Sequence, residues 1–442
     1  MFNKILEFSQ NKTEYLYNNS FILQNIDKLI FISIIAVFGA STVMSSDVIG
    51  FIALITAFLT FVKILVKPNE RLDISSFELW LLAYFMLVVV SLAGSTLFSL
   101  SLKGFFKTFT YLAFYVSLVQ YLKYNKNKLP YILGAIGVCV GFEAIVGFLQ
   151  NFAHVEEIST WQDVSNLNPE EVMTRVYGTL KPLNPNLLGG YFVAGIPSVY
   201  GLSAYFLNEK KYKYSVVALA VALLSTVTLF LTGCRGSYIG MFVIVAGMFA
   251  VSAKYLWQNY KQIYLSLVGG VVAFVTFAVL VSTSLRARVL SIFAMRQDSS
   301  NSFRFNVYQS SFEMFKDNWL LGIGVGNKNF REIYGLYMKT GFDALSAYNI
   351  YLEIAVESGI FALVAYLGFL FTLIKNAVRF ILKSADTNAV IFVATALISI
   401  CAVSIHGFVD TVFFRPQIQF LFWTMVAVAR VIVVDKNFIK LI

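Results

Sequence analysis

The chain has 442 residues, of which 58% are hydrophobic and 13% carry a charged side chain. Its mean hydropathy is +0.73, which excludes a soluble globular domain and is typical of a protein that crosses a membrane several times. The net charge of +10 arises mainly from lysine-rich turns between apolar segments. Such turns attract anionic membrane lipids, and no pattern in the chain favours binding of nucleic acid.

The apolar segments predict an all-α polytopic membrane protein with about twelve transmembrane helices, because a helix needs about 17–25 apolar residues to cross a bilayer. The expected spans are 28–44, 48–66, 79–100, 104–122, 129–152, 187–207, 213–232, 236–256, 263–283, 359–378, 388–405 and 412–433. The span 104–122 is the weakest, since it follows Lys103 and contains Lys107.

The spans divide the chain into segments, and two of the connections are long. We expect a cytoplasmic segment at 1–27, spans over 28–283 with an outer loop at 153–186, a large extracytoplasmic loop at 284–358, spans over 359–433 and a cytoplasmic tail at 434–442. The N-terminal residues lack the pattern of a cleaved signal peptide. Within the large loop, 303–316 shows helical spacing, and a short amphipathic helix at about 346–357 is expected at the membrane surface.

The basic residues predict the orientation of the spans. With the N-terminus inside the cell, 20 of the 34 basic residues lie on the cytoplasmic side, as the positive-inside rule requires. Arginine accounts for three of these 20 residues but for eight of the 14 on the outer side. Lysine and arginine are equivalent as topology signals, whereas a guanidinium can bind two oxygens at once. The outer side is therefore predicted to bind a phosphate or a carboxylate.

Two outer motifs place an arginine near the start of a helix. In RVYGTLKPLNPNLLGGYF, which begins at Arg175, either Asn184 or Asn186 can cap the following helix, whose free N–H groups favour an anion. A plain capped turn is the alternative. In LTGCRGSYIG, Arg235 lies between two apolar helices at their outer end. An arginine at membrane depth must face a cavity, a ligand or an acidic partner.

The remaining polar groups lie in the large loop and near the last two spans. Glu353 and Glu357 are one helical turn apart, which is usual for a solvated helix face. The stretch SIHGFVDTVFFRPQIQ at 404–419 contains His406, Asp410 and Arg415. A lone histidine at such a position is more often a hydrogen-bonded structural residue than a base. The clustered arginines make an anion-binding cavity the more credible interpretation. The three cysteines have no CxxC spacing and predict neither a disulfide framework nor a zinc site.

These motifs together resemble the O-antigen ligase and polymerase superfamily of bacterial membrane glycosyltransferases. The resemblance is carried by RVYGTLKPLNPNLLGGY at 175–191, CRG at 234–236, Arg304 before GIGVGN at 322–327, AYNIYLEIAVESG at 347–359 and HGFVDTVFFRPQIQFLFW at 406–423. The last two segments are closest to the branch that includes cyanobacterial proteins once described as bicarbonate transporters.

The resemblance implies transfer of a glycan from a polyprenyl-pyrophosphate carrier to a glycan, lipid or protein acceptor. The reaction is expected on the extracytoplasmic face of the bacterial plasma membrane, without a metal, a nucleotide or another cofactor. Clustered arginines can neutralise the charge that develops on the leaving pyrophosphate. The implied donor-binding residues are Arg175, Asn184, Asn186, Arg235, Arg304 and Arg415, with Arg235 and Arg304 the first choices for the pyrophosphate.

The sequence does not identify a single catalytic base. In the ligases a histidine stands directly before the asparagine of the loop helix, where this chain has Tyr348 before Asn349. A tyrosine with a pKa of about 10 is a poor base at neutral pH. The implied catalytic residues are therefore Tyr348, Asn349, Glu353, His406 and Asp410, with Glu357 as a further possible base. A reaction that needs little base assistance is the other alternative.

Two other functions are compatible with the same motifs. A transporter of a small anion such as bicarbonate would use an outward-facing cavity lined by arginine, and Glu143 in the middle of a predicted span favours it. The sequence shows no internal repeat or paired broken helices that would support a transport route. A flippase or an inactive relative would keep the lipid-facing groove without productive contacts to an acceptor, which Tyr348 in place of the family histidine allows.

Overall fold

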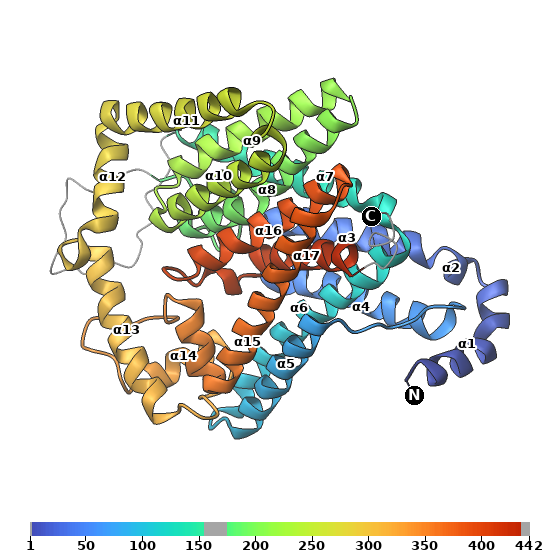
Figure 1. Ribbon diagram of the computed structural model, residues 1–442. Helices are drawn as coiled ribbons and strands as arrows, with labels where there is room; N and C mark the ends of the chain where they lie inside the picture. The colour runs from blue at the N-terminus through green and yellow to red at the C-terminus, as the bar shows by residue number, and fades with distance from the viewer. Residues whose placement is uncertain (1, 154–174, 435–442) are drawn as a thin grey trace.

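The computed structural model of the protein describes residues 2–153 and 175–434, and these residues form helices and connections without a strand (Figure 1). Most of the expected outer loop 153–186 and the tail from 435 onwards lie outside the described residues. Eleven of the described helices are long and apolar enough to cross a membrane. The protein is therefore a polytopic, all-α membrane protein, as predicted.

The eleven helices correspond to eleven of the expected spans. They are α3 (Ile26–Val43), α4 (Ser46–Val66), α5 (Ser76–Gly94), α7 (Leu129–Gln150), α8 (Pro185–Asn208), α9 (Tyr212–Leu231), α10 (Arg235–Leu256), α11 (Lys261–Val281), α15 (Ile350–Lys383), α16 (Thr387–His406) and α17 (Pro416–Val433). The weakest expected span corresponds to α6 (Phe98–Tyr124), which has 27 residues and packs against α4 and α17. It is not among the eleven helices, in line with its polar and basic residues.

The remaining helices are short or lie in the connections. They are α1 (Phe2–Asn19), α2 (Phe21–Gln24), α12 (Thr283–Phe293), α13 (Ser299–Asp317), α14 (Asn327–Tyr334) and the 3-10 helices η1 (Lys126–Lys128), η4 (Met295–Gln297) and η5 (Val412–Phe414). The large loop thus folds as α12, α13 and α14, which follow one side of the molecule in Figure 1 before the chain enters α15. The helical spacing at 303–316 falls within α13.

The loop helix and the tenth span meet at Gly359. The sequence predicts an amphipathic helix that ends before a span starting at 359, and the backbone of α15 leaves the helical conformation at this residue (φ 81°, ψ 174°), so α15 consists of two helices joined by a kink. A Cβ atom on Gly359 would lie 2.2 Å from the carbonyl oxygen of Leu320. The close approach of the loop backbone therefore requires glycine at the kink between the two helices.

The expected position of this helix at the membrane surface is wrong. Ile354, Ala355 and Val356 are buried within the protein. Val356 packs with residues of α13 and α14, and Ile354 packs with the main helical core. The first turns of α15 are therefore held between the loop helices and the bundle, because both faces of this segment have apolar partners.

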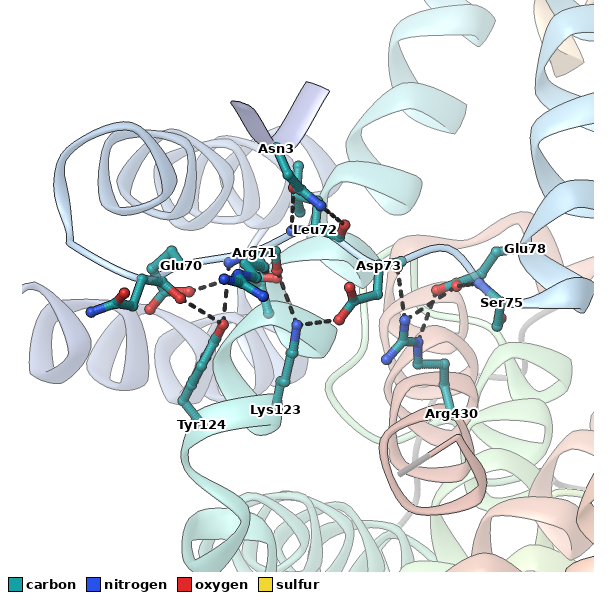
Figure 2. A network of polar contacts seen from close by, with 12 residues as sticks. Asn3, Glu70, Arg71, Leu72, Asp73, Ser75, Glu78, Lys123, Tyr124 and Arg430 are labelled. Carbon is teal, nitrogen blue, oxygen red and sulfur yellow. Dashed lines mark hydrogen bonds and ion pairs between the residues drawn. The ribbon is translucent and has the colours of Figure 1, made fainter. Parts of the chain in front are cut away.

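A network of polar contacts joins distant parts of the chain at the end of the bundle that carries Arg430 (Figure 2). Arg430 Nε lies 3.1 Å from Glu78 Oε1, and its Nη2 donates to the Asp73 carbonyl at 2.8 Å. Glu78 also accepts the Tyr115 hydroxyl at 2.8 Å. Lys123 forms an ion pair with Asp73, and this contact lowers the pKa of the Asp73 carboxyl. The network fixes the last helix to α5 and α6.

Replacing Arg430 with methionine is expected to destabilise the protein. The change leaves Glu78 partly buried without its cation, and removing one partner of a buried pair costs about 3–5 kcal/mol. We expect the apparent melting temperature in detergent to fall by about 5 °C or more, measured by intrinsic fluorescence. Arg379→Met is the matched control, because Arg379 is exposed and has no hydrogen bond or ion pair with the described residues. Equal shifts for both variants would contradict the role of the network.

Candidate functional site

The candidate site consists of two adjoining cavities where several helices begin or end. The first, the Arg415 cavity, has a volume of about 180 Å³, and its lining includes Lys107, Asn186, Tyr348, Glu353, Asp410 and Arg415. The second, the Arg304 cavity, has a volume of about 160 Å³, and its lining includes Arg235, Arg304, Phe305, Tyr308 and Val409. The structure thus brings together motifs from both halves of the sequence but divides the arginines between two cavities.

An ion pair connects the two cavities. Arg304 Nη2 lies 3.8 Å from Asp410 Oδ2, so a residue that lines one cavity is paired with a residue that lines the other. Asp410 Oδ1 accepts the N–H groups of Thr411 and Val412 at 2.7 and 3.1 Å, whereas Oδ2 has no hydrogen bond within the described part of the chain. Asp410 lies in the connection after α16 rather than on a helix, because α16 ends at His406.

Arg235 has an acidic partner. Its Nη1 lies 2.7 Å from Asp298 Oδ1 and donates to Ser291 Oγ at 3.1 Å. Asp298 also caps α13 by accepting the N–H of Asn301 at 2.9 Å. The sequence interpretation included an acidic partner without identifying it. Asp298 lies 63 positions away in a segment with no motif, so no signal in the sequence pointed to it.

Arg175 stabilises the start of α8. Its Nε donates to the Thr232 carbonyl at 2.8 Å, and its Nη2 donates to Asn186 Oδ1 at 2.6 Å. Asn184 is the cap of α8 and accepts the N–H of Asn186 at 2.7 Å. The expected helix cap is present, and Arg175 supports it through its hydrogen bond to Asn186. Asn184 and Asn186 both line the Arg415 cavity, whereas Arg175 lines neither cavity.

Arg415 differs from these arginines. It is half-buried immediately before α17 and lines the cavity named after it. Within the described ranges, its side chain makes no hydrogen bond or ion pair. Its positive charge therefore faces the cavity without a protein counterion in contact.

Tyr348 and Asn349 lie at the start of α15. Tyr348 has a left-handed backbone (φ 50°), and its ring lies 5.8 Å from the Arg304 guanidinium carbon. Burial raises the pKa of the Tyr348 hydroxyl, and the charge of Asp410 raises it further, so the hydroxyl stays protonated at neutral pH. Asn349 Oδ1 accepts the N–H groups of Tyr351 and Leu352 at 2.9 and 3.0 Å. Its amide donates to the Phe408 carbonyl at 3.1 Å. Asn349 is thus a helix cap whose amide oxygen and nitrogen are both hydrogen-bonded.

The two glutamates of α15 are buried and line the Arg415 cavity, contrary to the usual solvated position of such a pair. Glu353 is 2% exposed and accepts the N–H of Ala347 at 3.1 Å. Glu357 is 7% exposed and accepts the N–H of Gly326 in the GIGVGN turn at 2.8 Å. The turn therefore positions a carboxylate.

His406 is buried and lines neither cavity. It is 3% exposed, and its Nε2 lies 3.9 Å from Cys234 Sγ. A Cβ atom on Gly236 would lie 2.6 Å from His406 Cδ2, so the imidazole is packed tightly against α10. Burial works to raise the pKa of the Cys234 thiol, but hydrogen bonding to His406 and the charge of the imidazole lower it to about 7. These contacts favour a structural role for His406.

Cys234, His406 and Asp410 are also the described residues that could supply three ligands to one metal ion, since their donor atoms lie within 4.8 Å of one another. Cysteine, histidine and aspartate are all zinc ligands. However, the same Asp410 carboxylate faces the Arg304 guanidinium, and a guanidinium at that distance disfavours a second cation.

Glu143 is fully buried and accepts the hydroxyl and the N–H of Thr179 at 2.6 and 2.9 Å. It lines neither cavity. The mid-membrane glutamate that favoured a transporter is therefore a hydrogen-bonded structural residue that holds the segment leading to α8.

A family match covers part of the chain that contributes to the two cavities. Residues 220–367 match the O-antigen ligase family, and this part contains Arg235, Arg304, Tyr348 and Glu353. The match confirms the resemblance to the O-antigen ligase superfamily in this part of the chain.

The chain is also similar to the teichuronic acid biosynthesis protein TuaE of Bacillus subtilis (strain 168). The two are 25% identical over 222 residues, which cover 47% of this chain and 44% of the relative. The similarity thus spans less than half of the relative's length.

Proposed function

We propose that the protein moves a glycan from a polyprenyl-pyrophosphate carrier to an acceptor hydroxyl on the outer face of the bacterial plasma membrane. The proposal rests on one observation: arginines and buried carboxylates line the same two adjoining cavities. Arg304 and Arg415 face these cavities together with Glu353 and Asp410. Part of this site lies in the region that matches the O-antigen ligase family.

In the proposed reaction, the acceptor oxygen attacks the anomeric carbon of the glycan. The bond from this carbon to the carrier phosphate breaks, and the lipid pyrophosphate leaves with the bonding electrons. The positive charges of the site stabilise the leaving group as its charge develops, which is the function of a metal ion in many phosphoryl-transfer sites. We therefore propose that the reaction needs no metal.

We propose Glu353 as the base that takes the proton of the acceptor hydroxyl. Its carboxylate lines the Arg415 cavity, and one hydrogen bond from Ala347 holds it there. The other candidates are less suited, because Tyr348 is protonated, Asn349 is engaged as a cap and His406 is enclosed. Asp410 is proposed to orient Arg304 through their ion pair.

The experiment that tests this function uses the purified full chain in detergent with a polyprenyl-pyrophosphate oligosaccharide and candidate glycan, lipid and protein acceptors. We expect release of the lipid pyrophosphate and no more than about a twofold change in rate when EDTA is added. Arg235→Ala should lower the rate about tenfold or more, since Arg235 lines the Arg304 cavity and is anchored by Asp298. Absence of release with every acceptor, together with anion uptake into proteoliposomes, would instead favour a transporter.

A further inference from the structure

Lys107 of α6 lines the Arg415 cavity, although it belongs to none of the motifs of the sequence. Among the described residues, its side chain has no hydrogen bond or ion pair. Lys107 is therefore a second cation at the same cavity whose charge no contacting carboxylate neutralises.

The position of Lys107 is fixed by a backbone contact one turn earlier on α6. A Cβ atom on Gly104 would lie 2.3 Å from the carbonyl oxygen of Val325 and 2.6 Å from the Cα of Gly326. Gly326 itself has a φ of 117°, which favours glycine. The two glycines allow α6 to touch the GIGVGN turn directly, and this contact places the following turn of α6 at the cavity.

The arrangement of charge differs between the two cavities. In the Arg304 cavity, Arg235 is paired with Asp298 and Arg304 is paired with Asp410. In the Arg415 cavity, Lys107 and Arg415 have no such partners among the described residues. Of the carboxylates that line this cavity, Glu353 and Glu357 accept backbone N–H groups and Asp410 pairs with Arg304. A diphosphate carries at least two negative charges, and it gains most from cations that no protein carboxylate already binds.

We propose that Lys107 and Arg415 together form the subsite for the pyrophosphate of the lipid-linked donor. This proposal rests on the proposed function and assigns the donor phosphates to the Arg415 cavity rather than to Arg235 and Arg304. The guanidinium of Arg415 can bind two phosphate oxygens in its plane, and the ammonium of Lys107 supplies a compact charge to a third. Glu353 lines the same cavity, so the donor and the base meet there.

The test compares Lys107→Met with Lys103→Met. Lys103 lies one turn earlier on α6, is exposed and does not line the cavity. We expect Lys107→Met to raise the KM for the polyprenyl-pyrophosphate donor at least tenfold, whereas Lys103→Met leaves it within twofold. Lys107→Arg keeps the charge and should restore most of the affinity, which separates loss of charge from misfolding.

A direct binding measurement complements the kinetics. Inorganic pyrophosphate is titrated into each detergent-solubilised full-length variant, and binding is followed by microscale thermophoresis. Weaker binding for Lys107→Met than for Lys103→Met supports the subsite. If the wild-type chain releases lipid pyrophosphate and binds the probe but the two methionine variants behave alike, the subsite is wrong and the proposed function stands. If the wild-type chain releases no lipid pyrophosphate with any acceptor, the proposed function is wrong, and the subsite that rests on it is wrong as well.

Discussion

Replacing Arg415 with alanine is expected to lower kcat/KM for release of the lipid pyrophosphate by about three orders of magnitude. Removing one preorganised donor from an active site typically costs about 10²–10³ in rate, and removing an arginine that stabilises a transferring phosphate costs about 10³–10⁵. Arg415 lines its cavity and has no hydrogen bond or ion pair with the described residues. Its loss therefore removes a charge that the protein does not use elsewhere. The measurement is steady-state kinetics with a defined polyprenyl-pyrophosphate oligosaccharide.

Two further variants make the result specific. Arg415→Lys keeps a positive charge but loses the planar fork, so we expect an intermediate loss of about tenfold to a hundredfold. Arg331→Ala is the control, because Arg331 forms an exposed ion pair with Asp343 in the large loop and lines neither cavity. The apparent melting temperature of Arg415→Ala should match that of the wild type. Transfer by Arg415→Ala within twofold of the wild-type rate would remove Arg415 from the site.

Those parts of the fold and site that depend on local sequence could be predicted. The apolar windows identify the membrane helices, because burial in lipid requires a long apolar stretch. Asn184 could be identified as a possible cap of α8, because capping depends on a few neighbouring residues. The arginines of the outer motifs could be named as anion-binding candidates, since an arginine at membrane depth needs a polar partner.

Those parts that depend on tertiary contacts could not be predicted. Nothing near Arg235 in the sequence indicates that Asp298 is its partner, because the ion pair exists only when the fold brings the start of α13 next to the start of α10. The burial of Glu353 and Glu357 results from the packing of α15 against the GIGVGN turn and the bundle. A pair of glutamates at this spacing is compatible with a solvated helix as well, so periodicity alone gave the wrong environment.

Lys107 is an intermediate case, because a lysine within an apolar segment is visible in the sequence but has two interpretations. A lysine inside an apolar segment indicates a functional or paired group, but it served only to weaken the predicted span 104–122. The structure shows that α6 is a long helix within the bundle and that Lys107 faces a polar cavity. The lysine therefore weakens the hydropathy of α6 and contributes to the candidate site.

Replacing Glu353 with glutamine is expected to lower kcat by about 10²–10⁴, the usual contribution of a general base, with little change in KM for the donor. The glutamine oxygen can still accept the N–H of Ala347, so the side chain keeps its position. It cannot take a proton from the acceptor hydroxyl. The measurement is the rate of glycan transfer at saturating donor and acceptor, with the apparent melting temperature as a check on folding.

The comparison with Tyr348→Phe distinguishes the base from a neighbouring hydrogen-bond donor. Burial and the nearby charge of Asp410 raise the pKa of the Tyr348 hydroxyl, so this group stays protonated and can only position a substrate. We expect Tyr348→Phe to lower kcat less than about tenfold, as for the loss of one neutral hydrogen bond. If Tyr348→Phe abolishes transfer while Glu353→Gln retains it, Tyr348 has taken over the function of the family histidine and Glu353 is a structural residue.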